Sequence, residues 1–403
     1  MKEWLIFNDL ILLCISVGVF LITLFVLPRI RKTALKFNLM DSPNQRSSHD
    51  TVVPTFGGVA FYITLVFTLF ITQLLDTNDI TISLLVSLTI IFFVGLKDDF
   101  HELSPKMKFL GQVVTVLILM SQPEFLVYSL HGFFGIQEIH PIISIIFSSF
   151  LFLGFINAFN LIDGIDGFAS ITGIVIAGSY GLLFHSIGNY YFLAICVAVI
   201  SMLFAFLRFN FSSKKKIFMG DTGSLLIGTI LGLLTMKLLS LGGETYSALA
   251  IYRKEIPLLI LCILIIPTFD IARVIYIRVT QKKSIFSADR NHIHHVLIDA
   301  GLSHKQASLL IGIINILIVV SMYFSIKYFG IGFSLLLFFV IILSLIYTFF
   351  VMNKTYFAKK KKVKFRNFLI NCLSTFSLKH TANHNNYRLL LKQKIRSFRI
   401  FFF

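Results

Sequence analysis

The chain has 403 residues, of which 56% are hydrophobic and only 14% are charged, and its mean hydropathy is +0.85. A soluble protein of this length carries about 25% charged residues, so the composition excludes a soluble protein and predicts a polytopic membrane protein. The net charge of +17 does not indicate nucleic-acid binding, because thirteen of the 36 Lys and Arg lie in residues 354–403 and most others lie in alternate loops.

About eleven apolar runs are long enough to cross a bilayer as helices, so we expect an all-α fold. The runs cover residues 4–28, 52–75, 80–96, 107–121, 141–158, 165–184, 190–209, 217–239, 256–278, 307–327 and 329–352. The first run is too long for a signal peptide and lacks a small-residue cleavage site, so it is expected to be a span. Residues 1–353 then form one membrane domain, and residues 354–403 form a basic tail.

Positive charge alternates from loop to loop. Lys and Arg gather in the loops at 29–51, 97–108, 208–216 and 278–306, and the loops at 76–80, 121–141 and 185–189 have none. Only the loop at 239–255 departs modestly from this alternation, because it carries Arg253 and Lys254 where no positive charge is expected. Basic loops face the cytoplasm, so eleven spans place the N-terminus outside and the C-terminus in the cytoplasm.

The tail carries two features of its own. Lys359, Lys360, Lys361 and Lys362 form a basic run beside the last span, and such runs attract anionic lipid head groups. Residues 387–403 mix apolar and basic side chains, which is compatible with an amphipathic helix on the membrane surface or with a solvated tail.

The most unusual stretch lies between the fifth and sixth runs. Asn157, Asn160, Asp163 and Asp166 are spaced three residues apart at the end of a span. Ionisable side chains are costly there, so their default interpretation is a functional site. A cytoplasmic turn with an Asp N-cap is the structural alternative, but such a turn needs one of these residues and the stretch has four.

Four other polar segments fall on the same expected cytoplasmic side. They are residues 49–58, the pair Asp98-Asp99, residues 220–224 and residues 289–295. Because five segments bring acids, histidines and glycines to one membrane face, the sequence predicts a single active site there.

The acids in these segments favour a hard metal ion. Asp98 and Asp99 repel each other unless a cation binds, and clustered carboxylates suit Mg²⁺ or Mn²⁺. An ordinary span end beside Lys97 is the structural alternative. Asp221 lies in a glycine-rich turn whose free N–H groups would suit a phosphate, and the later glycines of that run also suit close helix packing.

Arg290, His292, His294 and His295 lie together on one loop. The histidines could bind zinc, but no cysteine is near and the acids favour a hard metal, so contacts with phosphate oxygens suit them better. Together these groups indicate phosphoryl chemistry on a lipid-borne substrate. A cation transporter is the alternative of another class, although its acids usually lie near the bilayer midplane.

The motifs make the chain resemble the polyprenyl-phosphate N-acetylhexosamine-1-phosphate transferases, integral membrane enzymes that begin cell-wall and surface-polysaccharide synthesis. The resemblance covers about residues 29–305. It rests on five motifs in the order of the family: His49-x4-Pro54-x2-Gly57-Gly58, Asp98-Asp99, Asn157-x2-Asn160-x2-Asp163-Gly164-x-Asp166-Gly167, Gly220-Asp221-x-Gly223-Ser224 and His292-x-His294-His295.

This resemblance implies transfer of a sugar 1-phosphate from a UDP-N-acetylhexosamine to undecaprenyl phosphate, with UMP as the second product. It implies Mg²⁺ as cofactor, with Mn²⁺ as an alternative, at the cytoplasmic face of a bacterial inner membrane, and it allows a homodimer. The implied catalytic residues are Asp98, Asp99 and Asp221, which would hold the metal together with Asn160. The implied substrate-binding residues are His49, Asn157, Asn160, Asp163, Asp166, Arg290, His292, His294 and His295.

Two positions differ from patterns that are typical of branches of this family. The branch that uses UDP-MurNAc-pentapeptide typically has three consecutive histidines, whereas Ile293 interrupts them here, as in the branch that uses UDP-N-acetylglucosamine. That branch usually has an Asp where this chain has Glu102. We therefore expect transfer of N-acetylglucosamine 1-phosphate for O-antigen, teichoic acid or similar synthesis, with another UDP-N-acetylhexosamine or UDP-MurNAc-pentapeptide as the alternative donor.

Overall fold

The computed structural model describes residues 2–37, 39–41, 52–75, 79–242, 253–284 and 291–377. Strands β1 (Met40–Asp41) and β2 (Val53–Pro54) form one short antiparallel pair, and every other regular element in these ranges is a helix. The prediction of an all-α fold is therefore confirmed apart from this pair. The chain divides into two compact units, Met1–Leu345 and Ile346–Phe403; the predicted boundary after residue 353 stays a prediction.

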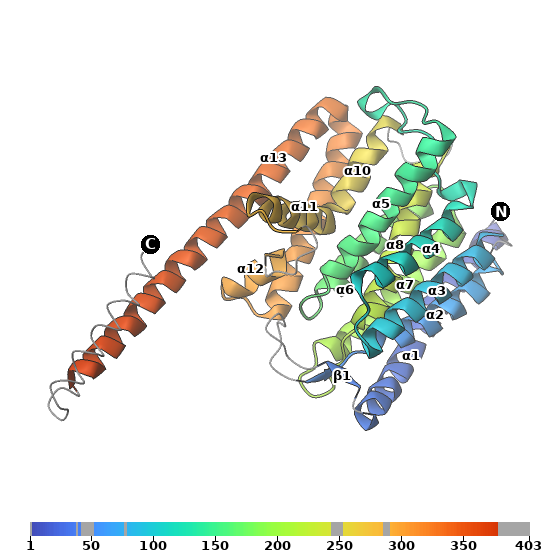
Figure 1. Cartoon of the computed structure of the whole chain (residues 1–403). Coiled ribbons are helices and arrows are strands. Elements are labelled where there is room, and N and C mark those ends of the chain that lie inside the picture. The colour runs from blue at the N-terminus through green and yellow to red at the C-terminus, as the bar shows by residue number, and fades with distance from the viewer. Residues whose placement is uncertain are drawn as a thin grey trace. The chain divides into compact units, whose positions relative to one another are not determined.

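The α-helices follow one another along the chain as labelled in Figure 1. They are α1 (Lys2–Lys36), α2 (Gly57–Thr72), α3 (Ile80–Phe100), α4 (Pro105–Met120), α5 (Pro141–Leu161), α6 (Phe168–Ser186), α7 (Tyr190–Asn210), α8 (Gly220–Ser240), α10 (Ile256–Ile263), α11 (Ile265–Thr280), α12 (Ile293–Asp299) and α13 (His304–Ser377). Three short 3-10 turns, η1 (Pro123–Phe125), η2 (Phe133–Gly135) and η4 (Arg253–Glu255), lie between them.

Seven helices in the described ranges are long and apolar enough to cross a membrane, and the bent pair of α10 and α11 would make an eighth. The seven lie in α1, α3, α5, α6, α7, α8 and α13. The chain is thus a multi-pass membrane protein. The predicted count of eleven spans and the orientation of the termini stay predictions, because α2 and α4 have 16 residues each and a bilayer-spanning helix needs about 20.

Residues 256–278, predicted as one span, form two helices. Helices α10 and α11 are bent by 75° at Leu264, which ends one and precedes the other. Pro267 lies in the first turn of α11, and its ring and missing N–H prevent a continuous helix through the Ile263 carbonyl. The apolar pattern could not reveal this break, because it is the same on both sides of the proline.

Helix α13 also contains a break. Gly330 has φ 73° and ψ −177°, a conformation that favours glycine. The hydroxyls of Ser325 and Ser334 are hydrogen-bonded at 2.9 Å, although nine residues of straight helix would separate them by about 13 Å. The chain therefore reverses at Gly330, close to the boundary predicted between the runs 307–327 and 329–352.

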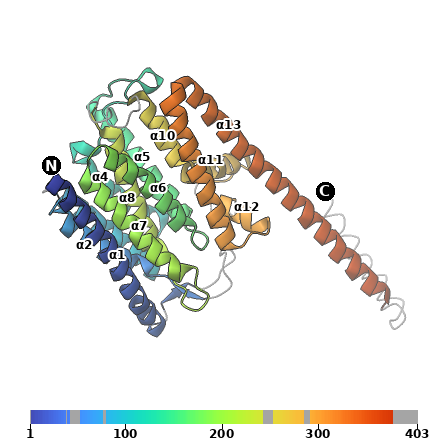
Figure 2. The ribbon, with the colours of Figure 1, turned by 180° about the vertical axis from the view of Figure 1, so that it is seen from behind.

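Helix α8 is the centre of the first unit. It contacts α2, α3, α5 and α6, and 94% of its span is buried, against 28% for α1. Helices α4 and α5 lie on the near side in Figure 1, and α1 and α7 lie on the near side in Figure 2. The predicted packing role of the α8 glycines is confirmed at Gly228, where a Cβ would lie 3.2 Å from the Ile156 carbonyl oxygen of α5.

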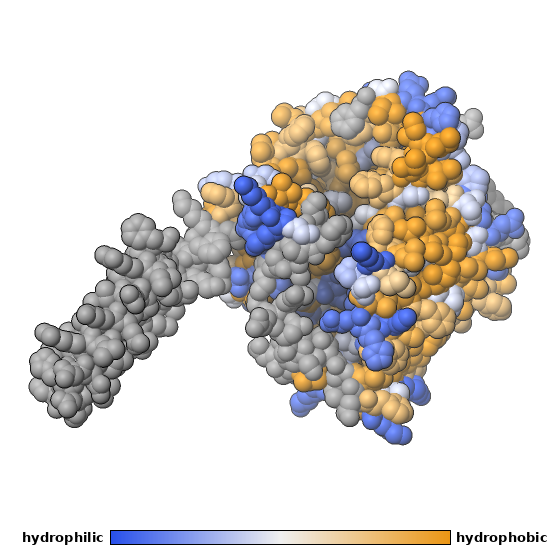
Figure 3. Space-filling model, in the orientation of Figure 1, coloured by the Kyte–Doolittle hydropathy of each residue, from blue (hydrophilic) through white to orange (hydrophobic). Residues whose placement is uncertain are grey.

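Large apolar side chains remain exposed on the outer helices. Phe70, Ile82 and Phe150 are 79%, 72% and 72% exposed. Broad apolar areas of this kind appear in orange in Figure 3. Such a surface would be a liability in water, and it is what a protein surrounded by lipid tails requires.

We predict that Gly95→Ala destabilises the protein. A Cβ at Gly95 of α3 would lie 2.8 Å from the Thr222 nitrogen and 3.0 Å from the Asp221 carbonyl oxygen. Both are backbone atoms of α8, so the clash cannot be relieved by a side-chain rotation, and overpacking costs about 1–3 kcal/mol. Thermal unfolding in detergent should show a lower Tm.

Gly154→Ala is the matched control. Gly154 also lies inside a helix, α5, but a Cβ there has no neighbour within 4 Å. Replacing a helical glycine by alanine in open space gains about 0.5–1 kcal/mol. If both variants melt at the same temperature, the close approach of α3 to α8 does not limit stability.

Candidate functional site

Four of the five sequence motifs meet at the first turn of α8. Helix α2 begins there, and the Gly58 N–H donates to the Met219 carbonyl at 2.9 Å. A Cβ at Gly58 would lie 2.6 Å from the carbonyl carbon of Thr222, so glycine permits the two helix ends to touch. His49, the first residue of the same motif, lies outside the described residues.

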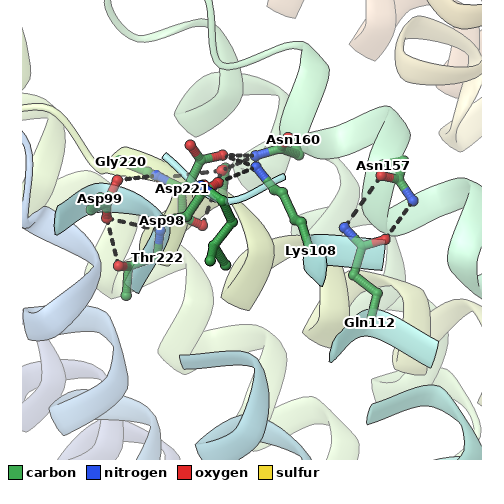
Figure 4. Close-up of polar contacts among 11 residues, drawn as sticks. Asp98, Asp99, Lys108, Gln112, Asn157, Asn160, Gly220, Asp221 and Thr222 are labelled. Carbon is green, nitrogen blue, oxygen red and sulfur yellow. Dashed lines mark hydrogen bonds and ion pairs between the residues drawn. The ribbon is translucent and has the colours of Figure 1, made fainter. Parts of the chain in front are cut away.

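The Asp99 carboxylate closes the N-terminus of α8 (Figure 4). Its Oδ1 accepts the Asp221 N–H at 2.7 Å, and its Oδ2 accepts the N–H and the hydroxyl of Thr222 at 3.0 and 2.5 Å. Asp99 belongs to α3, yet it satisfies donors that an N-cap side chain would satisfy, and its charge suits the positive end of the helix dipole. The prediction that these N–H groups are free for a phosphate is therefore wrong.

Lys108 of α4 joins Asp98 and Asp221. Its Nζ lies 2.8 Å from Oδ2 of Asp98 and 2.5 Å from Oδ1 of Asp221. The other oxygen of Asp98 accepts the Leu103 N–H at 2.7 Å. One ammonium group thus lies between two carboxylates that would otherwise repel each other at short range. The two neighbouring acids of the Asp98-Asp99 motif therefore have different partners.

The last turn of α5 supplies an amide, that of Asn160, to Asp221. Asn160 Nδ2 donates to Oδ1 of Asp221 and to the Ser224 hydroxyl, both at 2.7 Å. Asn157, one turn earlier, instead exchanges hydrogen bonds with Gln112 of α4 at 2.7 and 3.3 Å. Figure 4 shows Asn160 beside Asp221 and Asn157 turned towards Gln112. The structure thus brings Asn160, but not Asn157, to the acids.

Asp163 lies in the loop between α5 and α6 and is half-buried. No residue that the structure describes donates a hydrogen bond to its carboxylate. Burial and the negative charges of Asp221, Asp99 and Asp166 raise the pKa of this carboxyl to about 8. Asp163 is therefore the acid of this group whose charge is least compensated by the protein itself.

Asp166, in the same loop, is held by cationic partners. Its Oδ2 lies 2.7 Å from Lys216 Nζ and 3.3 Å from His304 Nδ1. Burial alone would raise the pKa of Asp166, but the interactions with His304 and Lys216 outweigh burial and lower it. The Asp166 carbonyl also accepts the Ser308 hydroxyl at 2.7 Å, so this residue anchors the loop to the start of α13.

Helix α12 brings the fifth motif to this loop. His292 Nδ1 lies 2.8 Å from Oδ2 of the buried Asp270, whose Oδ1 accepts the Ile293 N–H at 2.7 Å. The His294 ring stacks on His292 at 5.6 Å, and a Cβ at Gly164 would overlap the His294 ring. His292, His294 and His295 are all buried. Arg290 lies outside the described residues.

Four polar residues of the site belong to no motif that the sequence singled out: Lys108, Gln112, Lys216 and His304. Lys108 and Gln112 lie four residues apart within an apolar run. A charged group and an amide on one face of a membrane helix are themselves a sign of function, and that sign could have identified both. Lys216 and His304 lie in basic loops, where nothing in the sequence distinguishes them from other charged residues.

The donor set fits a metal ion that is shared with a substrate. Within the described ranges, no three His, Cys, Asp or Glu side chains are grouped to hold a metal by themselves. The Asp221 side chain is 37% exposed, and no described residue donates a hydrogen bond to the Asp163 carboxylate. Both carboxylate oxygens of Asp99, in contrast, already accept hydrogen bonds from α8. Mg²⁺ is usually held by one or two carboxylates together with substrate phosphates, and Asp221 with its neighbours fits that arrangement.

Comparisons with known proteins agree with these motifs. A family model described as Glycosyl transferase family 4 matches residues 81–239. The probable undecaprenyl-phosphate N-acetylglucosaminyl 1-phosphate transferase of Bacillus subtilis (strain 168) is 32% identical over 305 residues, which cover 75% of this chain and 81% of that protein. The undecaprenyl-phosphate alpha-N-acetylglucosaminyl 1-phosphate transferases of Salmonella typhi and Escherichia coli (strain K12) are 32% and 31% identical over 306 residues, or 73% of this chain and 78% of each relative.

We predict that Asp99→Ala lowers the Tm of the detergent-purified protein. Loss of a helix cap costs about 0.5–2 kcal/mol, and here it also leaves buried N–H groups of Asp221 and Thr222 without an acceptor. Asp221→Asn is the comparison variant: it keeps the Asp99 carboxylate on α8 and weakens only the contact with Lys108, so it should cost less Tm than Asp99→Ala. Equal melting of Asp99→Ala and the wild type would contradict the capping role.

We also predict a pH-dependent stabilisation by Asp163→Asn in EDTA. The carboxyl has a pKa of about 8 in the folded protein and about 3.9 in an unfolded chain. Its ionisation therefore opposes folding. Between about pH 4 and about pH 8 the folded protein keeps a proton that the unfolded chain has lost, so the free energy of unfolding of the wild type falls as the pH rises through this range. The Tm gain of Asp163→Asn should be small near pH 4 and larger at pH 8, and a gain independent of pH would be inconsistent with a half-buried acid that has no compensating partner.

Proposed function

Because the chain belongs to glycosyl transferase family 4, we propose that it transfers N-acetylglucosamine 1-phosphate from UDP-N-acetylglucosamine to undecaprenyl phosphate. The products are undecaprenyl-pyrophosphoryl-N-acetylglucosamine and UMP. The names of the relatives from B. subtilis, S. typhi and E. coli support this transferred group and this acceptor. The lipid-linked sugar would then begin a cell-wall or surface polysaccharide.

The observation that carries this proposal is the convergence of Asp98, Lys108, Asn160 and Asp221 at the first turn of α8. These side chains come from four helices and meet where an apolar, membrane-spanning bundle ends. Phosphoryl transfer depends on positioning and on charge compensation more than on covalent chemistry by the protein. A compact group of carboxylates with one ammonium and one amide supplies both.

We assign Mg²⁺ to Asp221, with Asn160 and Asp163 beside it. Asp99 is a poor ligand because both of its oxygens already accept hydrogen bonds from α8, so we propose that it holds the helix. Asp98 is engaged by Lys108 and Leu103 and would act mainly on the position of Lys108. A Mg²⁺ ion held there would supply charge neutralisation and orientation for the donor pyrophosphate.

The reaction requires little proton transfer. An oxygen of the acceptor phosphate attacks the phosphorus that carries the sugar, and the bond from this phosphorus to the UMP oxygen breaks. A phosphate monoester has a second pKa of about 6, so the acceptor is mostly a dianion at neutral pH and needs no general base. Lys108 compensates the charge that accumulates as the two phosphates approach, and fixed geometry supplies much of the remaining acceleration.

The histidine motif completes the donor side in this proposal. His294 lies against Gly164 of the loop that carries Asp163 and Asp166, so a nucleotide bound to this loop would reach the start of α12. We assign contacts with donor phosphates to His292, His294, His295 and Arg290, and a further substrate contact to His49. The basic loops support a cytoplasmic active site, where a soluble donor meets an acceptor held in the bilayer.

Purified protein in detergent should release UMP and form the lipid product when it is given undecaprenyl phosphate, Mg²⁺ and UDP-N-acetylglucosamine. Asp221→Asn should lower kcat by roughly 100-fold or more, similar to the loss of one essential charge-stabilising group, and EDTA should abolish turnover. The measurement is UMP release with detection of the lipid, across a panel of UDP-sugars.

Glu124→Gln is the control, because Glu124 pairs with Lys237 near the opposite end of α8 from the site. It should keep wild-type turnover. Transfer only from another UDP-N-acetylhexosamine would retain the chemistry and correct the donor, whereas no transfer from folded protein would contradict the proposal. A pH–rate profile that loses its acidic limb in Asp98→Asn, with unchanged Mg²⁺ dependence, would show that Asp98 acts as a base.

A further inference from the structure

Gln112 of α4 is a buried amide next to the site. It is 1% exposed, and its amide exchanges two hydrogen bonds with that of Asn157 on α5. Asn157 Nδ2 donates to Gln112 Oε1 at 2.7 Å, and Gln112 Nε2 donates to Asn157 Oδ1 at 3.3 Å. Asn157 Nδ2 also donates to the Leu153 carbonyl at 2.8 Å. The polar atoms of both side chains are thus engaged within the protein.

Each member of this pair lies one helical turn from a residue that contacts Asp221. Lys108 precedes Gln112 by four residues and Asn160 follows Asn157 by three, so each couple shares one face of its helix. Lys108 Nζ and Asn160 Nδ2 then reach the same atom, Oδ1 of Asp221, at 2.5 and 2.7 Å. Figure 4 shows the amide pair and the two contacts to Asp221 side by side across α4 and α5.

We propose that Gln112 and Asn157 form an amide clamp that sets the register of α4 against α5 and thereby positions Lys108 and Asn160 on Asp221. Gln112 is then a positioning residue of the transferase. The catalytic part of this inference rests on the proposed function, whereas the clamp itself does not.

The clamp opposes sliding of α4 along its axis, which the apolar contacts of α4 do not. Helix α4 packs on α3 through Gly111, where a Cβ would collide with Val94, and such a contact fixes distance but little direction. A buried amide that loses its partner pays the full desolvation penalty. A slip of one residue, about 1.5 Å along a helix, would break the amide pair and also withdraw Lys108 from Asp221.

The first test uses stability alone and needs no substrate. Gln112→Leu and Asn157→Leu, singly and together, are compared by thermal unfolding in detergent. The double variant should lose no more Tm than the more affected single variant, and Asp221→Asn should cost less in the Gln112→Leu background than in the wild type. Additive effects at both pairs of positions would overturn the clamp.

Gln122→Leu is the matched control. Gln122, just beyond the other end of α4, donates from Nε2 to the Ser83 hydroxyl of α3 at 2.7 Å, so it is also an amide contact with a neighbouring helix. Its effect on Tm should simply add to that of Asp221→Asn. Gln112→Asn, which keeps an amide on a shorter arm, serves if Gln112→Leu does not fold.

The second test separates positioning from substrate binding. Gln112→Leu should lower kcat by about tenfold or more, as expected when a supporting group displaces catalytic atoms, with KM for UDP-N-acetylglucosamine within about twofold. The exchange Gln112→Asn with Asn157→Gln should recover activity relative to either single change, and Gln122→Leu should keep wild-type kcat.

Three results of this second test would overturn the positioning role. These are an equal loss of kcat in Gln122→Leu, a rise in KM at unchanged kcat, and an exchange variant no better than the single variants. A wild-type protein without transferase activity would contradict the proposed function instead, and the stability comparison would still decide the clamp.

Discussion

The buried N-terminus of α8 is the constraint on which the rest of the site depends. A helix that begins inside a protein leaves N–H groups without partners, and a buried N–H group that finds no acceptor is costly. Asp99 meets this need from a neighbouring helix by accepting three hydrogen bonds from Asp221 and Thr222. To do so α3 must approach α8 closely, which Gly95 permits. The same approach delivers Asp98 to the side of Asp221.

Charge compensation then decides what each acid of the site is free to do. Lys108 is shared by Asp98 and Asp221, and Lys216 with His304 holds Asp166. Asp163 has no such partner among the residues described, and its pKa is raised accordingly. The site therefore has some acids that serve structure, and it has Asp163, whose ionisation would be favoured by a bound cation or by hydrogen-bond donors on a substrate. A Mg²⁺ ion shared with a pyrophosphate is the ligand that we propose for these acids.

Much of the architecture could be predicted from the sequence because lipid imposes simple rules. Long apolar runs become helices, and the polar motifs between them were expected to share one face, as four of them do around α8. The roles within each motif could not be predicted, because they depend on partners from other helices. Asp98 and Asp99 are adjacent, yet Asp98 pairs with Lys108 and Asp99 caps α8. Asn157 is hydrogen-bonded to Gln112, whereas Asn160 is hydrogen-bonded to Asp221. The bend at Leu264 was not predicted either, because the apolar pattern continues unchanged across Pro267.

Hydropathy and motif spacing are local properties of the chain, so the residues alone were enough to predict a helical, multi-pass membrane protein and to identify its family. The folded arrangement was needed to see that Asp99 caps α8, that Lys108 lies between two acids, and that Gln112 is hydrogen-bonded to Asn157. Each of these is a contact between residues far apart in the chain. Such contacts arise from the way helices pack at a few ångströms, where one turn of register decides which polar groups meet.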